Sequence, residues 1–257
     1  MKDNTNNKEF WNNYVTYWEN KVKQANEEKN AADRTSDDKN LETYFRKLDV
    51  TKKDKFLDFG CGSCRLFPIY LNVVGEDSQN YIGIDISGVS LEHAERKYSK
   101  LGLNKNLIEF DGIHIPFGNE TFDKIMCFSV FGACSQEETI KELLRILKKD
   151  GLILLTGKNN EYFTDDKEAL IAEINARKKN HPNSFTDVHE LKKQLKNYGT
   201  DIVEEFYFLR RGDFPKNSFT KKIPKKFYEW ALVIKKNRIN NYYEFEKFSN
   251  CYSAVNK

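Results

Sequence analysis

The segment from Lys55 to Gly157 alternates short apolar runs with helix-forming stretches of about 10 to 15 residues. The runs read KFLDFG, YIGIDI, LIEFD, FDKIMCFSV and GLILLTG, and RLFPIYLNVV, SLEHAERKYSKLG and SQEETIKELLRILKKDG lie between them. Parallel strands need such crossover connections. The alternation therefore predicts an α/β fold, a doubly wound and mainly parallel sheet with helices on both faces. Gly102 and Gly151 are the predicted ends of two of the helices.

The pattern changes after Gly157. DDKEALIAEINARKKN and DVHELKKQLKNYG have the apolar spacing of two amphipathic helices. DIVEEFYFL and KFYEWALVIKK then predict two strands, and we expect an antiparallel pair because the segment between them contains no crossover helix. We therefore divide the chain into a core of residues 51–237, with a helical insertion at about 161–200, and a tail of residues 238–257 that has no predicted element.

The first fifty residues precede the predicted core. EFWNNYVTYWENKVKQANEEKN predicts a helix with its large apolar side chains on one side, and LETYFRKL predicts a short second helix. Those side chains are Phe10, Trp11, Tyr14, Tyr17, Trp18 and Val22. Packing against the core is the simpler interpretation, and a lid over a pocket is the alternative. Residues 1–50 are therefore interpreted as an N-terminal helical lid or extension.

The net charge and the distribution of apolar residues indicate which classes of binding partner to expect. A net charge of +3 in 257 residues gives no reason to expect nucleic acid or an anionic membrane surface as a partner. No stretch approaches 18 uncharged apolar residues, and the N-terminus has no apolar signal segment. We expect a cytoplasmic protein that leaves its five cysteines as free thiols.

The stretch FLDFGCGSC, residues 56–64, permits three interpretations. Gly60 and Gly62 after a strand, with Asp85 at the end of the next strand, suit a small cofactor that carries a ribose. A dinucleotide-binding turn needs a small residue at position 65, where this chain has Arg65. A redox or metal site at Cys61 and Cys64 is disfavoured because Cys127 and Cys134 lack the spacing of a second ligand pair.

Several motifs in order carry a more specific resemblance. LDFGCGSCR, GIDIS, FDGIHIPFGNETFDKIMC and ELLRILKKDGLILLTG resemble the class I S-adenosylmethionine-dependent methyltransferases, which have a Rossmann-like, seven-stranded fold. The resemblance covers residues 33–160, and DRTSDDKNLETYFRKL is similar to the lead-in helix of members that act on small molecules. It implies transfer of a methyl group from S-adenosyl-L-methionine, with S-adenosyl-L-homocysteine as the product.

The resemblance also implies roles for residues of this chain. Asp58 and the backbone of Gly60, Cys61 and Gly62 would surround the methionine part of the cofactor, and Asp85 would hold the ribose hydroxyls. The residues implied around the adenine, or in closing the site, are Ile86, Asp111, Gly112, Ile113 and Phe128. Each residue also has a plain structural interpretation, such as a turn cap for Asp111 or core packing for the two isoleucines and Phe128.

The acceptor is less constrained. CFSVFGACS follows the fourth strand where an NPPY-like motif would indicate methylation of an adenine or glutamine amino group, and the same stretch has no carboxylate for a magnesium ion. We therefore expect no metal, and an oxygen or nitrogen of a small metabolite or cell-surface glycan precursor as acceptor. His181 is a weak candidate base.

Arg210 and Arg211 begin a basic stretch that suits a phosphorylated or nucleotide-linked acceptor, although a solvated flank is the simpler interpretation. Two alternative functions stay open. One is an NAD(P)-dependent oxidoreductase, and the other is a non-catalytic subunit that binds S-adenosylmethionine. The oligomeric state is not predicted.

Overall fold

The computed structural model describes residues 8–28, 37–75, 78–103, 106–239 and 243–251. Within them, a seven-stranded sheet has the order β3-β2-β1-β4-β5-β8-β7. The strands are β1 (Phe56–Phe59), β2 (Tyr81–Asp85), β3 (Leu107–Glu109), β4 (Phe122–Cys127), β5 (Leu147–Lys158), β7 (Thr200–Phe208) and β8 (Glu229–Lys236). Strands β1 to β5 are parallel, so the predicted fold class is confirmed.

Helices cover both faces of the sheet, which buries both sides of its central strands, such as β1. One face packs against α2 (Asp38–Phe45), α3 (Phe67–Val74) and α4 (Gly88–Tyr98). The other face packs against α5 (Gln136–Ile146) and α7 (Val188–Asn197). Strand β1 is buried along its whole length, so the turn that follows it starts from the middle of the core.

Strand β8 runs antiparallel to both of its neighbours, β5 and β7, as the missing crossover helix predicts. Its register sets Glu229 opposite Lys158 on β5 and opposite Phe208 on β7. The insertion contains α6 (Lys167–Lys178) and α7, which are the two predicted helices. A two-residue strand, β9 (Ser249–Asn250), pairs with β6 (Phe185–Thr186) in the segment without a predicted element.

The predicted helix end at Gly151 is wrong. Helix α5 ends at Ile146, and β5 begins at the next residue and runs through Gly151. A Cβ at position 151 would lie 2.8 Å from the carbonyl oxygen of Asp123 and 2.9 Å from that of Lys148. The glycine therefore permits close approach of two backbone segments rather than helix termination. Gly102 does follow a helical turn, with φ of +80°.

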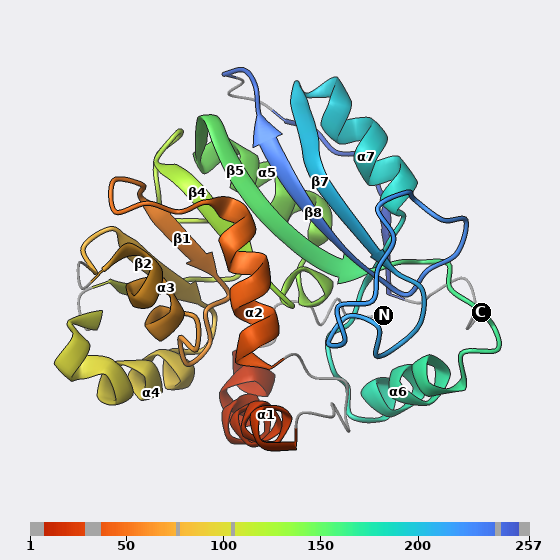
Figure 1. Ribbon diagram of the computed structural model, residues 1–257, viewed down its shortest axis with the longest axis horizontal. Coiled ribbons are helices and arrows are strands. Elements are labelled where there is room, and N and C mark those ends of the chain that lie inside the picture. Colours follow the sequence, from red (N-terminus) through yellow and green to blue (C-terminus); the bar gives the residue numbers. More distant parts are fainter. Residues whose placement is uncertain (1–7, 29–36, 76–77, 104–105, 240–242, 252–257) are drawn as a thin grey trace.

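Helix α1 (Lys8–Glu28) lies at the end of the sheet toward which the arrowheads of β1 and β5 point (Figure 1). Polar contacts join it to the segments at the carboxyl end of β2. Ser87, the N-cap of α4, donates to Asn12 Oδ1 at 2.8 Å, and His93 Nδ1 lies 3.0 Å from Glu19 Oε1. Lys8 also pairs with Glu109. Among the described helices, none is long and apolar enough to span a lipid bilayer.

Candidate functional site

The turn after β1 has a backbone conformation that its two glycines permit. Gly60 and Gly62 have φ of +70° and +53°, in the left-handed region that favours glycine. A Cβ on Gly60 would lie 2.5 Å from both methyl carbons of Val130, whereas a Cβ on Gly62 would meet no atom within 4 Å. Gly60 therefore serves close packing, and Gly62 leaves its backbone open to the space in front of the turn.

Asp85 joins this turn to the end of β2. Its carboxylate accepts the backbone N–H of Gly62 at 2.9 Å through Oδ2 and the N–H of Ser87 at 2.8 Å through Oδ1. Burial raises the pKa of Asp85, while the backbone donors lower it. A carboxylate has about four lone-pair sites, so two accepted N–H bonds leave capacity for two ligand hydroxyls.

Asp58, within β1, is a second carboxyl at this turn. It is buried and accepts a hydrogen bond from the hydroxyl of Tyr81 at 2.6 Å. Burial raises its pKa to about 7, and the Tyr81 bond and the charge of Arg65 act in the opposite direction. A nearby cation, such as a ligand ammonium or sulfonium group, would stabilise the ionised form of this carboxyl.

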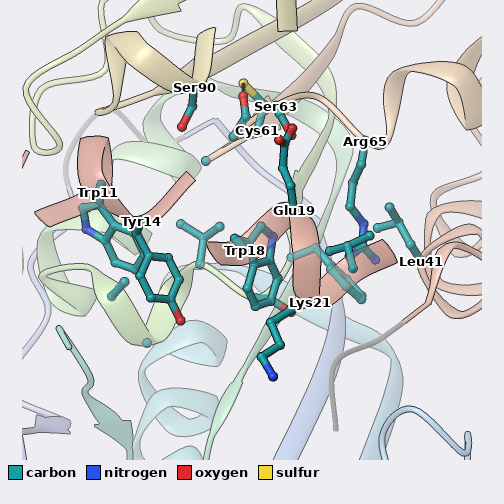
Figure 2. Close-up of a pocket in the computed structure, with 18 of the residues that line it drawn as sticks. Trp11, Tyr14, Trp18, Glu19, Lys21, Leu41, Cys61, Ser63, Arg65 and Ser90 are labelled. Carbon is teal, nitrogen blue, oxygen red and sulfur yellow. Dashed lines mark hydrogen bonds between the residues drawn. The ribbon is translucent and has the colours of Figure 1, made fainter. Parts of the chain in front are cut away.

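These groups open onto one large cavity, of about 1580 Å³, beyond the carboxyl ends of β1, β2, β4 and β5. Its position at the change in strand order between β1 and β4 is where open α/β sheets bind ligands. Figure 2 shows Ser90, Cys61 and Ser63 on one side of it and the α1 side chains Trp11, Tyr14 and Trp18 across from them. The predicted cofactor residues that line it are Asp58, Gly60, Cys61, Gly62, Asp85, Ile86, Gly112 and Phe128.

Two of the predicted cofactor residues, Asp111 and Ile113, are not among those that line the cavity. Asp111 accepts the backbone N–H groups of Ile113 and His114 at 2.8 and 2.7 Å, and its Oδ2 lies 2.7 Å from His114 Nδ1. These bonds hold the pKa of Asp111 at about 2 and raise that of His114. Here Asp111 caps a turn, and its neighbours Phe110 and Gly112 line the cavity instead.

The far end of the cavity contains a network of buried charge. Lys158, at the end of β5, has its Nζ 2.9 Å from Oε1 of Glu173 on α6, and it donates to Asn183 Oδ1 at 3.1 Å. Glu173 is 1% exposed and also accepts from Tyr228 OH and Asn183 Nδ2. Its pKa is lowered, because Lys158 and these donors outweigh the effect of burial.

The structure separates the two arginines of the predicted basic stretch. Arg210 donates to both carboxylate oxygens of Asp165, at 3.0 and 3.1 Å, and is not among the residues that line the cavity. Arg211 lines the cavity, and its Nη1 donates to Tyr228 OH at 3.1 Å. Only the second arginine is therefore close enough to meet a ligand in the cavity.

His181 also lines the cavity, in the loop between α6 and β6. Its Nδ1–H donates to the carbonyl oxygen of Pro182 at 2.8 Å, and the rings of Phe10, Trp11 and Tyr14 surround it at centroid distances of 5.2 to 5.3 Å. Burial, together with the charge of Lys158, lowers its pKa to about 4. The imidazole is neutral at pH 7, and it joins α1 to this loop through ring contacts.

Sequence reasoning missed Glu229, which lines the same end of the cavity. Burial raises its pKa to about 7, although the charges of Arg211 and Lys158 lower it. One signal was present in the sequence: Glu229 interrupts the apolar run FYEWALVI, where a charged residue is unusual. The same search would not have found Glu173, because an acidic residue on a helix is ordinary.

The cysteines of the turn are buried free thiols, and the other three cysteines are also free. Burial raises the pKa of the Cys61 thiol well above its usual range, so thiolate chemistry is disfavoured. Cys64 has φ of +55°, a conformation unusual for a residue with a Cβ. Within the described ranges, no group of three or more His, Cys, Asp or Glu side chains is arranged to hold a metal ion.

Comparison with known proteins bears on this site directly. Residues 57–155, from β1 to β5, match a family model described as a methyltransferase domain. Residues 57–155 are a methyltransferase domain. The match includes the turn after β1 and Asp85 and ends within β5 at Leu155, so the matched segment contributes one wall of the cavity.

Relatives of this methyltransferase domain are found among archaeal and bacterial proteins. An uncharacterised protein of Methanocaldococcus jannaschii is 33% identical over 114 residues, 43% of this chain and 39% of that protein. Methyltransferase GfsG of Streptomyces halstedii is 24% identical over 136 residues, 51% of this chain and 48% of its own length. The chain thus spans less than half the length of each of these relatives.

Solved structures extend the likeness of fold beyond the methyltransferase domain. A Thermotoga maritima S-adenosylmethionine-dependent methyltransferase, described as a possible histamine N-methyltransferase, covers 89% of this chain and 99% of its own, with a TM-score of 0.60 and 15% identity. The [4+2]-cyclase SpnF covers 77% of this chain and 81% of its own, with a TM-score of 0.56 and 15% identity. The same fold thus occurs in a cyclase and in a methyltransferase, so the fold does not specify the reaction.

S-adenosylmethionine is the cofactor that the domain and its neighbours imply. The donor set of the cavity fits it. Asp85 offers unused acceptor sites for two hydroxyls, Gly62 leaves open space in front of the turn, and Asp58 is a desolvated carboxyl that a cationic group would stabilise.

Proposed function

We propose that this protein is an S-adenosylmethionine-dependent methyltransferase that acts on an oxygen or nitrogen atom of a small molecule. One observation carries the proposal. The turn after β1, the Asp85 carboxylate and the Asp58 carboxyl border a single cavity that continues to a second, charged and aromatic end under α1. Such a cavity has room for a cofactor and an acceptor together, because drug-sized ligand pockets are about 300–1000 Å³.

Residues of the first end would bind the cofactor. Asp85 would accept from the ribose hydroxyls, and Asp58 with the backbone of Gly60 and Gly62 would hold the methionine part. Ile86, Gly112 and Phe128 would contact the remaining apolar surface. The roles predicted for Asp111 and Ile113 draw no support from the cavity lining. The bound cofactor supplies a methyl group that its positive sulfur has already activated.

The chain's own contribution would be to align the acceptor and exclude water. Alignment of the reacting groups alone can lower the activation barrier by about 7 to 11 kcal/mol. Trp11, Tyr14 and Trp18 of α1 cover the cavity, which supports the interpretation of the N-terminal region as a lid. Arg211 is the residue that would meet a phosphorylated or nucleotide-linked acceptor, and a glycan precursor of that kind fits the same position.

The test is titration calorimetry with S-adenosylhomocysteine and, separately, with NADH. We expect saturable binding of S-adenosylhomocysteine and none of NADH, because Arg65 is fixed beside the turn by Asp38 at 3.4 Å and by the carbonyl of Asp37 at 3.3 Å. Binding of NADH alone, or of neither compound, would refute the proposal. Labelled methyl transfer to a panel of hydroxyl, amine and phosphorylated acceptors then separates an enzyme from a non-catalytic subunit.

A further inference from the structure

Glu229 is a carboxyl of the cavity wall that forms no ion pair with any residue the structure describes. It is the first residue of β8 and lies opposite Lys158 in the β5–β8 register. Within the described ranges, its carboxylate has neither a hydrogen bond nor an ion pair. The residue is partly exposed, at the cavity wall. A carboxylate with reduced access to water and no partner is unfavourable, so its presence there indicates a ligand that offsets its charge.

The nearby cations are already engaged by other groups. Lys158 pairs with Glu173 at 2.9 Å and donates to Asn183, and Arg211 donates to the Tyr228 hydroxyl, which itself donates to Glu173. The charged and titratable groups that act on Glu229 come from four elements. They are Tyr44 of α2, Lys158 of β5, Glu173 of α6, and Arg211, Asp213 and Tyr228 of the segment between β7 and β8.

The charges around Glu229 do not neutralise its carboxylate. Burial raises its pKa to about 7, and Glu173 and Asp213 act in the same direction, against Arg211 and Lys158. At neutral pH the group is close to half ionised. A ligand cation would shift it to the ionised form, whereas a ligand anion would meet a carboxyl on this wall.

Aromatic rings of the cavity favour the same ligand charge. Trp11, Tyr14 and Trp18 of α1 and Phe128 and Phe214 of the core line the cavity. The faces of such rings attract ammonium groups. His181, enclosed by the first two of these rings and Phe10, is neutral and adds no repulsion.

We propose that the methyl acceptor is an amine whose ammonium group pairs with Glu229, and that Glu229 takes the proton that the nitrogen must lose. The inference rests on the proposed function and narrows its acceptor from oxygen or nitrogen to nitrogen. The N–H bond breaks, an O–H bond forms on Glu229, and the nitrogen keeps the electron pair. That pair forms the N–C bond to the methyl carbon, while the S–C bond breaks and its electrons stay on sulfur.

The first test compares ligands of one shape and different charge on the protein saturated with S-adenosylhomocysteine. 2-Phenylethylamine, 2-phenylethanol and 3-phenylpropionate are titrated at pH 8. We expect the amine to bind at least tenfold more tightly than the other two. Glu229→Gln should abolish that preference, and Glu229→Asp should retain part of it. Near pH 6.5, amine binding to the unchanged protein should release a proton, measured in buffers of different ionisation enthalpy, and the Gln variant should release none.

Glu161→Gln is the matched control, because Glu161 is an exposed glutamate outside the set that lines the cavity. It should behave as the unchanged protein. The second test is labelled methyl transfer to primary arylalkylamines. Glu229→Gln should lower kcat by about 10² to 10⁴, the usual contribution of a positioned base.

Equal binding of amine and alcohol, tighter binding of the anion, or an amine preference that survives Glu229→Gln would overturn the inference. Absence of methylation on every amine, or full turnover by the Gln variant, would do the same. Binding of S-adenosylhomocysteine distinguishes failure of the proposed function from failure of the acceptor assignment. Its loss in the unchanged protein would refute the proposed function, whereas its retention with a failed amine test would refute the acceptor assignment alone.

Discussion

The carboxylate of Asp85, at the end of β2, accepts the backbone N–H of Gly62, in the turn after β1, at 2.9 Å. The bond joins two predicted cofactor residues that are 23 positions apart in the sequence. It orients the carboxylate toward the cavity and holds the turn against the neighbouring strand. The proposed ribose contact would use the same two carboxylate oxygens, so one side chain would both hold the turn and bind the cofactor.

Replacing Asp85 by Ala should lower affinity for S-adenosylhomocysteine by at least 100-fold. Two hydrogen bonds to a charged group are lost, each contributing about 1.5–3 kcal/mol. Asp111→Ala is the control, because Asp111 caps a turn and does not line the cavity. Calorimetry on both variants, with thermal unfolding to confirm folding, measures the difference. Equal losses in the two variants would contradict the assignment.

Gly60→Ala and Gly62→Ala should separate packing from binding. Both residues have positive φ, which costs an alanine about 1–2 kcal/mol. Only at Gly60 would the new methyl group also overlap Val130, at 2.5 Å. Urea unfolding should show the larger stability loss for Gly60→Ala, and calorimetry should show weakened cofactor binding in Gly62→Ala. Equal stability of the two variants would argue against the described packing.

Lys158→Met should destabilise the protein by about 3 kcal/mol. The change leaves Glu173, which is 1% exposed, as a buried charge without its cation. Lys192→Met is the matched control, since its partner Glu205 is 29% exposed and its ion pair is expected to contribute at most about 1 kcal/mol. Urea unfolding at pH 7 compares the two. A loss at Lys158 no larger than at Lys192 would contradict the description of this network as buried.

Glu229 should make the stability of the protein depend on pH in a defined direction. Its pKa is raised from 4.5 to about 7 on folding. Between pH 4.5 and pH 7 the folded state therefore keeps a proton that the unfolded state has released. The contribution of this proton to the free energy of unfolding is fully present below pH 4.5 and is lost as the pH rises through 7. We expect Glu229→Gln to gain stability relative to the unchanged protein between pH 5 and pH 8, by up to about 3 kcal/mol. A difference in unfolding free energy that is constant with pH would exclude this shift.

Helix α1 should loosen when its aromatic contact with the α6–β6 loop is removed. His181→Ala deletes the ring that Phe10, Trp11 and Tyr14 surround. The remaining contacts with the rest of the chain include the exposed polar pair of Lys8 with Glu109. Amide hydrogen exchange over residues 8–28 should therefore be faster in the variant. His189→Ala, at an exposed position on α7, is the control, and unchanged exchange in His181→Ala would contradict a closing role for this contact.

Much of the fold could be predicted because its determinants are local or periodic. The strand and helix alternation, the antiparallel β7–β8 pair and the helical α1 all follow from apolar spacing in short windows. The turn after β1 was recognisable because only glycine accepts positive φ at no steric cost. The end of α5 was misplaced, since Gly151 is required by close contact with Asp123 rather than by a helix terminus.

The meeting of Gly60, Gly62 and Asp85 at one cavity could be predicted from the sequence alone, because the ends of parallel strands meet at one edge of a sheet, whereas their cofactor-binding role stays a prediction. The proposed acceptor end depends on tertiary structure. Glu229 and Lys158 are 71 positions apart, and only the β5–β8 register brings them together. The pKa of Glu229 and the neutrality of His181 depend on burial and on charges from distant segments, which apolar spacing does not encode.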